Sequence, residues 1–183
     1  MLSPADRRAL LQLAETSIEK GLGGERLRVE PGDYSPVLQQ PGASFVTVRI
    51  RRELRGCIGT LEHERVLVID VVKNAYAAAF RDPRFAPLSR AEFKHLHVHI
   101  SVLGRPQPIE FTCERDLVEQ LRPGVDGIIL QEGSCRATFL PAVWESLPEP
   151  QEFMQQLKCK AGLAADYWSD KITVQRYIAE SIP

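Results

Sequence analysis

The 183-residue sequence lacks long apolar runs, and it lacks an excess of charge of either sign. No run approaches the roughly 20 apolar residues that a membrane-spanning helix requires, so we expect no membrane partner. Lysines and arginines number 23 against 24 aspartates and glutamates, which leaves a net charge of −1. Such a balance offers no electrostatic basis for binding nucleic acid, and we expect none.

Cysteine is also scarce, and its spacing argues against a small protein stabilised by disulfides. The four cysteines (Cys57, Cys113, Cys135 and Cys159) lie far apart and form no Cys-x-x-Cys pair. The first residues, Met1-Leu2-Ser3-Pro4, carry no secretion signal. A disulfide framework is therefore not expected, and the sequence predicts a cytoplasmic protein in a reducing environment. The sequence indicates no cofactor, so none is expected.

The composition is that of an ordinary globular chain, with 44% hydrophobic and 26% charged residues. Its length fits a single domain over residues 1–183, which can have two lobes. Apolar periodicity, capping residues and turn residues then predict the elements. We expect helices over residues 4–20, 66–80, 114–121 and 151–161, a short helix after Ser89, and strands over 45–50, 54–60, 96–102, 127–131, 136–140 and 172–178.

A weak internal repeat is visible in the order of these elements. Strand, turn, strand and helix over residues 45–80 recur over residues 127–162. Leu54-Arg55-Gly56-Cys57 falls where Cys135-Arg136-Ala137-Thr138 would fall in the second copy. The pattern suggests a duplicated hairpin–helix unit.

The stretch at residues 54–60, Leu-Arg-Gly-Cys-Ile-Gly-Thr, is the most distinctive part of the chain. Glycine is kept inside a strand mainly where another backbone, a ligand or a sharp bend comes close. Strict alternation places alternate residues on opposite faces of the strand. The core face would carry Leu54, Gly56, Ile58 and Thr60, and the other face Arg55, Cys57 and Gly59. The motif therefore predicts a guanidinium beside a thiol, on a surface cleared by glycine.

Cys57 is a candidate nucleophile in this motif. A nearby cation such as Arg55 favours the thiolate, and His63 is a candidate base. The alternative is that Cys57 is a small buried hydrophobic residue, as free cysteines usually are. Nothing in the sequence places His63 within hydrogen-bond reach of the sulfur, so both interpretations stay open.

Two further groups of polar residues are candidate sites. His97 and His99 share one face of a strand and could supply two metal ligands, although the alternative is a polar surface that faces solvent. Arg81-Asp82-Pro83-Arg84-Phe85 follows a buried helix and concentrates charge in a turn. Such a turn is either a binding position or a helix end whose carbonyl groups attract Arg81.

At residues 54–60, and at Phe45-Val46-Thr47-Val48 before them, the chain resembles the AMMECR domain family, also called AmmeMemoRadiSam system protein A, and the resemblance covers roughly residues 5–180. Further matching segments follow in order along nearly the whole chain. They are Asp82-Pro83-Arg84-Phe85, Ile100-Ser101-Val102-Leu103, Gly124-Val125-Asp126-Gly127, Ala137-Thr138-Phe139-Leu140-Pro141, Lys160-Ala161-Gly162-Leu163 and Tyr167-Trp168. Two departures are the turn Arg51-Arg52-Glu53, which lacks small residues, and His99, where an acidic residue is expected.

The resemblance implies an α+β fold with a mainly antiparallel sheet and two unequal lobes around a cleft. It implies association with a Memo-like protein and a radical S-adenosylmethionine protein, but it brings no established reaction. The motif residues that it implies at a ligand-binding cleft are Arg55, Gly56, Cys57, Gly59, Thr60, Asp82, Arg84 and Ser101.

Three hypotheses follow. The first is an enzyme, or the substrate-handling component of one, in which Cys57 reacts or contacts the ligand and Arg55 and Arg84 bind an anion. Its substrate would be a small molecule or a protein. The second is a non-catalytic interaction module that docks a partner protein through the glycine-containing strand. The third is a metal-binding protein that uses His97 and His99.

Overall fold

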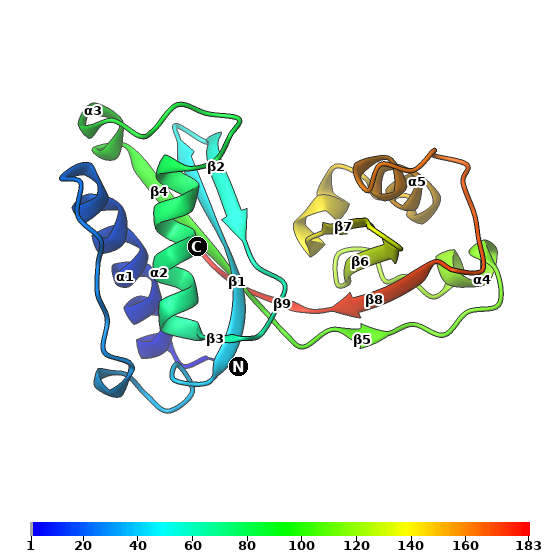
Figure 1. The fold of residues 1–183 in the computed structure, drawn as a ribbon, viewed down its shortest axis with the longest axis horizontal. Coiled ribbons are helices and arrows are strands. Elements are labelled where there is room, and N and C mark those ends of the chain that lie inside the picture. Colours follow the sequence, from blue (N-terminus) through cyan, green and yellow to red (C-terminus); the bar gives the residue numbers. More distant parts are fainter. Residues whose placement is uncertain (1) are drawn as a thin grey trace. The chain divides into compact units, whose positions relative to one another are not determined.

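The computed structural model describes residues 2–183, which form two compact units (Figure 1). The first unit comprises the chain up to Leu103 together with Glu180–Pro183, and the second comprises Gly104–Ala179. Each unit has its own sheet and its own hydrophobic core. None of the helices in the described part of the chain is both long enough and apolar enough to cross a bilayer.

The first sheet contains the motif strand at its edge. Its strands are β1 (Pro41–Ile50), β2 (Glu53–Gly59), β4 (Leu96–Leu103) and β9 (Ala179–Ile182), in the order β2-β1-β4-β9. The two-residue strand β3 (Arg65–Val66) pairs with the start of β1. β1 pairs antiparallel with both β2 and β4 and is therefore the strand that fixes the position of the motif.

Two helices cover one face of this sheet (Figure 1). α1 (Pro4–Leu22) begins at a capping box between Ser3 and Asp6, and α2 (Leu67–Phe80) packs between α1 and strands β1 and β2. α3 (Arg90–Phe93) has a second capping box, between Ser89 and Glu92. A short 3-10 helix, η1 (Pro31–Asp33), lies in the connector before β1. Apolar residues on the helix-facing side of the strands form the core with α1 and α2, among them Val46, Val48, Val98 and Ile100.

The second unit has a sheet in the order β5-β8-β6-β7. Its strands are β5 (Gln107–Pro108), β6 (Gly127–Glu132), β7 (Cys135–Phe139) and β8 (Thr173–Tyr177). Its helices are α4 (Glu114–Glu119), η2 (Pro141–Glu145) and α5 (Pro150–Lys160). Phe153 of α5 is fully buried and stacks on the Trp144 ring at 3.7 Å between ring centroids, so this tryptophan belongs to the core.

The predicted α+β fold with mainly antiparallel sheets is confirmed, and the predicted helices are all present. The order strand, strand, helix does recur, as β1-β2-α2 and β6-β7-α5. Most boundaries differ by one or two residues, but β1 begins at Pro41 rather than Phe45. The predicted last strand, 172–178, corresponds to β8, and the strand β9 that follows it was not predicted: after Tyr177 the chain leaves the second sheet and adds β9 to the first. Apolar periodicity predicts that a segment is a strand, but it does not predict which sheet the strand joins.

The β1–β2 turn has an unusual backbone. Arg51 and Arg52 have φ angles of 51° and 73°, which is the left-handed region that a tight hairpin turn requires and that Asn-Gly usually supplies. A non-glycine residue in this region costs roughly 1–2 kcal/mol. The sequence therefore indicated a turn here without its usual residues, and the structure shows that two arginines take the strained positions.

We expect Arg52→Gly to raise the free energy of unfolding by about 0.5–1 kcal/mol, because glycine adopts positive φ without strain but gains entropy in the unfolded chain. Urea unfolding followed by circular dichroism measures the change. The control is Arg105→Gly, at an exposed position whose φ is not positive, which should lower stability. A loss of stability in Arg52→Gly equal to that of the control would contradict the analysis of the turn.

Candidate functional site

A β-bulge interrupts the motif strand at Arg55. Val48 pairs with Gly56 and Arg49 pairs with Leu54, so Arg55 has no cross-strand partner in this register. A bulge changes the direction of a side chain and breaks the alternation of faces. The expectation that Leu54 lies in the core is wrong for this reason: its side chain is 40% exposed, and Ile58 alone supplies the core contact of the motif.

The two motif glycines are required by packing inside the first unit. A Cβ atom at Gly56 would overlap the backbone carbonyl of Ala78 in α2. A Cβ atom at Gly59 would overlap the ring of Phe45, its cross-strand partner. The space beside the two glycines, which was expected to be open to a ligand, is therefore occupied by the protein itself. The backbone of α2 fills it at Gly56, and the ring of Phe45 fills it at Gly59.

Asp82 and Arg84 hold the outer edge of β2 at Cys57. The Cys57 N–H donates to Asp82 Oδ2 at 2.9 Å, and Arg84 Nη2 lies 3.4 Å from the Cys57 carbonyl oxygen. Because β2 is the outermost strand, these backbone groups have no strand beside them to pair with. We call this arrangement the edge clasp. The sequence placed Cys57, Asp82 and Arg84 together, and the structure brings them into contact.

The edge clasp is also an ion pair. Arg84 donates from Nε to Asp82 Oδ1 at 2.9 Å and from Nη2 to Asp82 Oδ2 at 2.7 Å. Asp82 is 4% exposed, and the Arg84 hydrogen bonds hold the pKa of its carboxyl far below the usual range despite the burial. The same contact raises the pKa of Arg84, with a smaller contribution from nearby Cys57. Arg84 is therefore already bonded to a carboxylate.

The Cys57 sulfur has a hydroxyl donor beside it. Thr47 pairs with Cys57 across β1 and β2, and its hydroxyl donates to Sγ at 3.3 Å. Thr47 also pairs with His99 on β4, so the three residues form one row on the face of the sheet away from α1 and α2. His99 Nε2 lies 2.7 Å from the Ser181 hydroxyl oxygen. Burial, with a smaller contribution from Arg49, lowers the pKa of His99, so its imidazole is neutral at pH 7.

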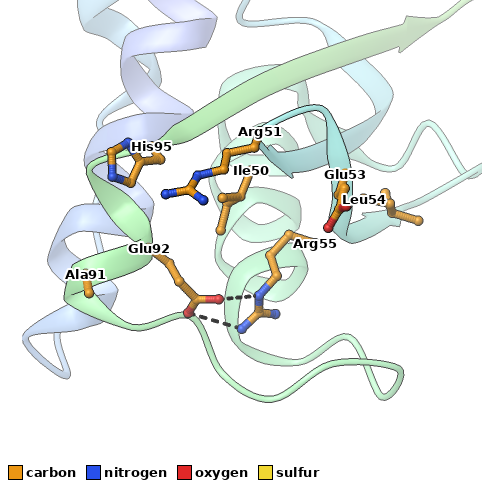
Figure 2. Close-up of a pocket in the computed structure, with 8 residues that line it drawn as sticks. All are labelled: Ile50, Arg51, Glu53, Leu54, Arg55, Ala91, Glu92 and His95. Atoms are coloured by element: carbon orange, nitrogen blue, oxygen red, sulfur yellow. Dashed lines mark hydrogen bonds and ion pairs between the residues drawn. The ribbon is translucent and has the colours of Figure 1, made fainter.

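Arg55 faces a pocket of about 600 Å³ between the β1–β2 hairpin and α3 (Figure 2). Its guanidinium donates from Nε to Glu92 Oε1 at 2.7 Å and from Nη2 to Glu92 Oε2 at 3.3 Å. The pocket is lined by Ile50, Arg51, Glu53, Leu54, Arg55, Ala91, Glu92 and His95. Cys57 is absent from this lining, so the expectation that Arg55 and Cys57 share one hollow does not hold, and the cation near the thiol is Arg84 instead.

Three other predicted residues lie away from the sulfur. His63 Nε2 is 3.0 Å from the Leu103 carbonyl oxygen, and within residues 2–183 no hydrogen bond joins His63 to Cys57. The Thr60 hydroxyl donates to Asp70 Oδ1 at 2.8 Å, which ties the end of the motif to α2. Ser101 is buried on β4, opposite Phe45.

The histidine pair does not form a metal site with other side chains of the described chain. His97 is exposed and lies opposite Arg49, and His99 bonds to Ser181. Among residues 2–183, no three histidine, cysteine, aspartate or glutamate side chains gather as metal ligands would. The two imidazoles therefore lack the third protein ligand that a zinc site requires.

With this geometry in place, comparisons with known proteins give the family. The AMMECR1 family profile matches residues 11–182. The chain belongs to the AMMECR1 family. It is 35% identical to a protein of Methanothermobacter thermautotrophicus, over 98% of this chain and 94% of that protein, and 34% identical to one of Thermofilum pendens, over 91% and 84%. Neither relative is named for an activity.

A solved structure gives the same fold. The crystal structure of an uncharacterized protein from Pyrococcus horikoshii matches with a TM-score of 0.87 and 33% identity, covering 94% of this chain and 88% of that one. The likeness agrees with the α+β architecture described above for this AMMECR1-family chain.

Sequence reasoning missed two partners of the motif. Glu92 was assigned only to the capping box of α3, where its Oε2 accepts the Ser89 N–H at 2.8 Å, but it also pairs with Arg55. Thr47 was assigned only to a strand. The cross-strand register would have found Thr47 opposite Cys57, but the register depends on the bulge, which has no signal in this sequence.

We expect Gly56→Ala to lower the free energy of unfolding by about 3 kcal/mol, because the backbone of α2 cannot yield to a new methyl group. Gly59→Ala should cost less, since the Phe45 ring can rotate away. The control is Gly32→Ala, where a Cβ atom would meet nothing within 4 Å. Urea unfolding of the three variants ranks their losses in the free energy of unfolding. Equal losses for Gly56→Ala and Gly32→Ala would contradict the packing argument.

The ion pair of Glu92 predicts a specific pH dependence. The Arg55 hydrogen bond, with the Ser89 N–H, lowers the pKa of Glu92 from 4.5 to about 2 in the folded protein. As pH falls, the unfolded chain takes up this proton before the folded chain does, so stability present above pH 4.5 is lost toward pH 2.

We therefore expect Glu92→Gln to reduce stability at pH 7 and to have progressively less effect between pH 4.5 and pH 2. Unfolding midpoints at several pH values give the comparison. Glu64→Gln is the control, because Glu64 is exposed and makes no ion pair with any described side chain. A Glu92→Gln effect that stays constant across this range would exclude the ion pair as its cause.

Proposed function

We propose that this AMMECR1-family protein handles its substrate through the thiol of Cys57, as an enzyme or as the substrate-handling component of one. The observation that supports this proposal is the surroundings of the sulfur. It accepts a hydrogen bond from Thr47, and the guanidinium of Arg84 reaches the carbonyl of the same residue. A hydroxyl that donates to the sulfur, with a cation at the same residue, can stabilise negative charge that develops on the sulfur during a reaction.

The edge clasp supports a chemical role for the Cys57 thiol rather than a role as a buried core residue. Cys57 is only partly buried, unlike a cysteine that packs as a core residue. Its backbone is fixed on one side by Thr47 in the sheet and on the other by Asp82. A nucleophile held in one orientation loses little entropy when it meets its substrate.

Family membership supports the partners that we propose for this protein. The resemblance stated above links the AMMECR domain with a Memo-like protein and a radical S-adenosylmethionine protein, and we propose both as partners, with a small molecule or protein as substrate. The proposed compartment is the cytoplasm, where the four cysteines, all free in the structure, stay reduced. A non-catalytic docking module is less well supported, because both motif glycines are required for internal packing.

The test is the alkylation rate of Cys57 with iodoacetamide at pH 7. The protein for this test carries serine at Cys113, Cys135 and Cys159, and a second protein keeps Cys159, which is exposed, as its single cysteine. We expect Cys57 to react faster than Cys159 despite its lower exposure, because the Thr47 hydroxyl contacts its sulfur and Arg84 contacts its carbonyl group.

Two variants separate the causes. Thr47→Val and Arg84→Gln should each slow alkylation of Cys57 by about threefold or more, because each removes a polar contact that Cys57 makes in the structure. Arg90→Gln, which changes an exposed arginine of α3, is the matched control and should leave the rate unchanged. A Cys57 rate below that of Cys159, unaffected by either variant, would reject the thiol proposal.

A further inference from the structure

The pocket between the β1–β2 hairpin and α3 is a second candidate site, distinct from Cys57 (Figure 2). Its volume of about 600 Å³ lies within the range of small-molecule pockets. All eight lining residues belong to the first unit, and they come from two elements that are far apart in the sequence. The hairpin supplies five of them, and α3 with the following turn supplies three.

Arg51 offers a free cation to this pocket. Figure 2 shows its guanidinium between Ile50 and His95. Within residues 2–183, its side chain makes no hydrogen bond or ion pair. Its backbone has a positive φ of 51°, and strained backbone tends to persist where it presents a functional side chain. The turn therefore holds an unpaired guanidinium at the pocket at a cost in stability.

The four charged side chains of the pocket, two arginines and two glutamates, carry no net formal charge. Glu92 neutralises Arg55, whose Nη1 is buried without a hydrogen-bond partner among the described residues. Glu53 is exposed at the wall and carries a charge opposite to that of Arg51. Two arginines thus face two glutamates, and a ligand with several negative charges would be repelled by the two glutamates. The pocket suits at most one negative charge.

Apart from His95, the uncharged part of the lining is apolar. Ile50, Leu54 and Ala91 contribute hydrocarbon surface, and Leu54 is one of the few large apolar side chains exposed on the described molecule. The bulge at Arg55 accounts for this position, because it turns Leu54 away from the core. Hydrocarbon surface and an unpaired cation in one pocket match a ligand that has one apolar part and one charged end.

We propose that this pocket binds a monocarboxylate with an apolar body. The carboxylate pairs with the guanidinium of Arg51, whose planar fork fits two carboxylate oxygens. The apolar body packs against Ile50, and the imidazole of His95, which also lines the pocket, can donate a further hydrogen bond to the carboxylate.

The test is an NMR titration of the full-length protein labelled with ¹⁵N, with hexanoate as the probe. We expect saturable shifts of backbone amide signals in residues 50–55 and 91–95. Arg51→Gln should weaken binding about tenfold, the effect of losing a charge-assisted hydrogen bond. The matched control is Arg52→Gln, since Arg52 occupies the same turn with the same sign of φ but does not line the pocket.

Three comparisons decide the outcome. Hexanamide, which has the same apolar body without the charge, should bind at least about tenfold more weakly. Hexyl phosphate should also bind more weakly than hexanoate, because of Glu53 and Glu92. Cys57→Ser should leave hexanoate binding unchanged, which separates this site from the thiol. Equal weakening by Arg51→Gln and Arg52→Gln, tighter binding of hexyl phosphate, or shifts confined to other regions would overturn the proposal.

Discussion

The arrangement around the motif depends on one buried carboxylate. Asp82 accepts the outward N–H of Cys57 and pairs with Arg84, which in turn reaches the Cys57 carbonyl. An edge strand normally exposes such groups to solvent or to another chain. Here the side chains of Asp82 and Arg84, two residues apart in the chain, contact the N–H and the carbonyl oxygen of Cys57 respectively. The end of α2 is thereby joined to the middle of β2, and the strand cannot shift relative to the helix.

The bulge at Arg55 divides the motif into two sides with different chemistry. Residues from Gly56 onward keep the sheet alternation, so Ile58 faces the core and Cys57 lies beside Thr47. Leu54 and Arg55 instead line the pocket with α3. The Phe85 ring lies near both arginines of the region, 5.7 Å from the Arg55 guanidinium carbon and 5.4 Å from that of Arg84. The motif thus places the Cys57 thiol on one side of the bulge and two pocket residues, Leu54 and Arg55, on the other.

Much of the fold follows from local signals. Ser3 caps the first helix as expected, Ser89 forms the capping box that its spacing with Glu92 predicted, and the alanine-rich run at residues 66–80 forms the buried helix α2. These predictions succeed because caps and apolar periodicity act within a few residues. Sheet membership failed at the C-terminus, where β9 joins the first sheet, because pairing between distant strands has no local signature.

For the site, the sequence by itself determined the family, because its motifs are specific, and the resemblance placed Cys57, Asp82 and Arg84 among the residues of one cleft, three residues that are in contact in the structure. Only the tertiary structure decided which arginine lies near the thiol. A single extra residue in β2 turned Arg55 toward Glu92, and the turn after α2 placed Arg84 at the strand edge instead. Side-chain direction depends on register and on long-range packing, and neither is encoded in the spacing of residues along the chain.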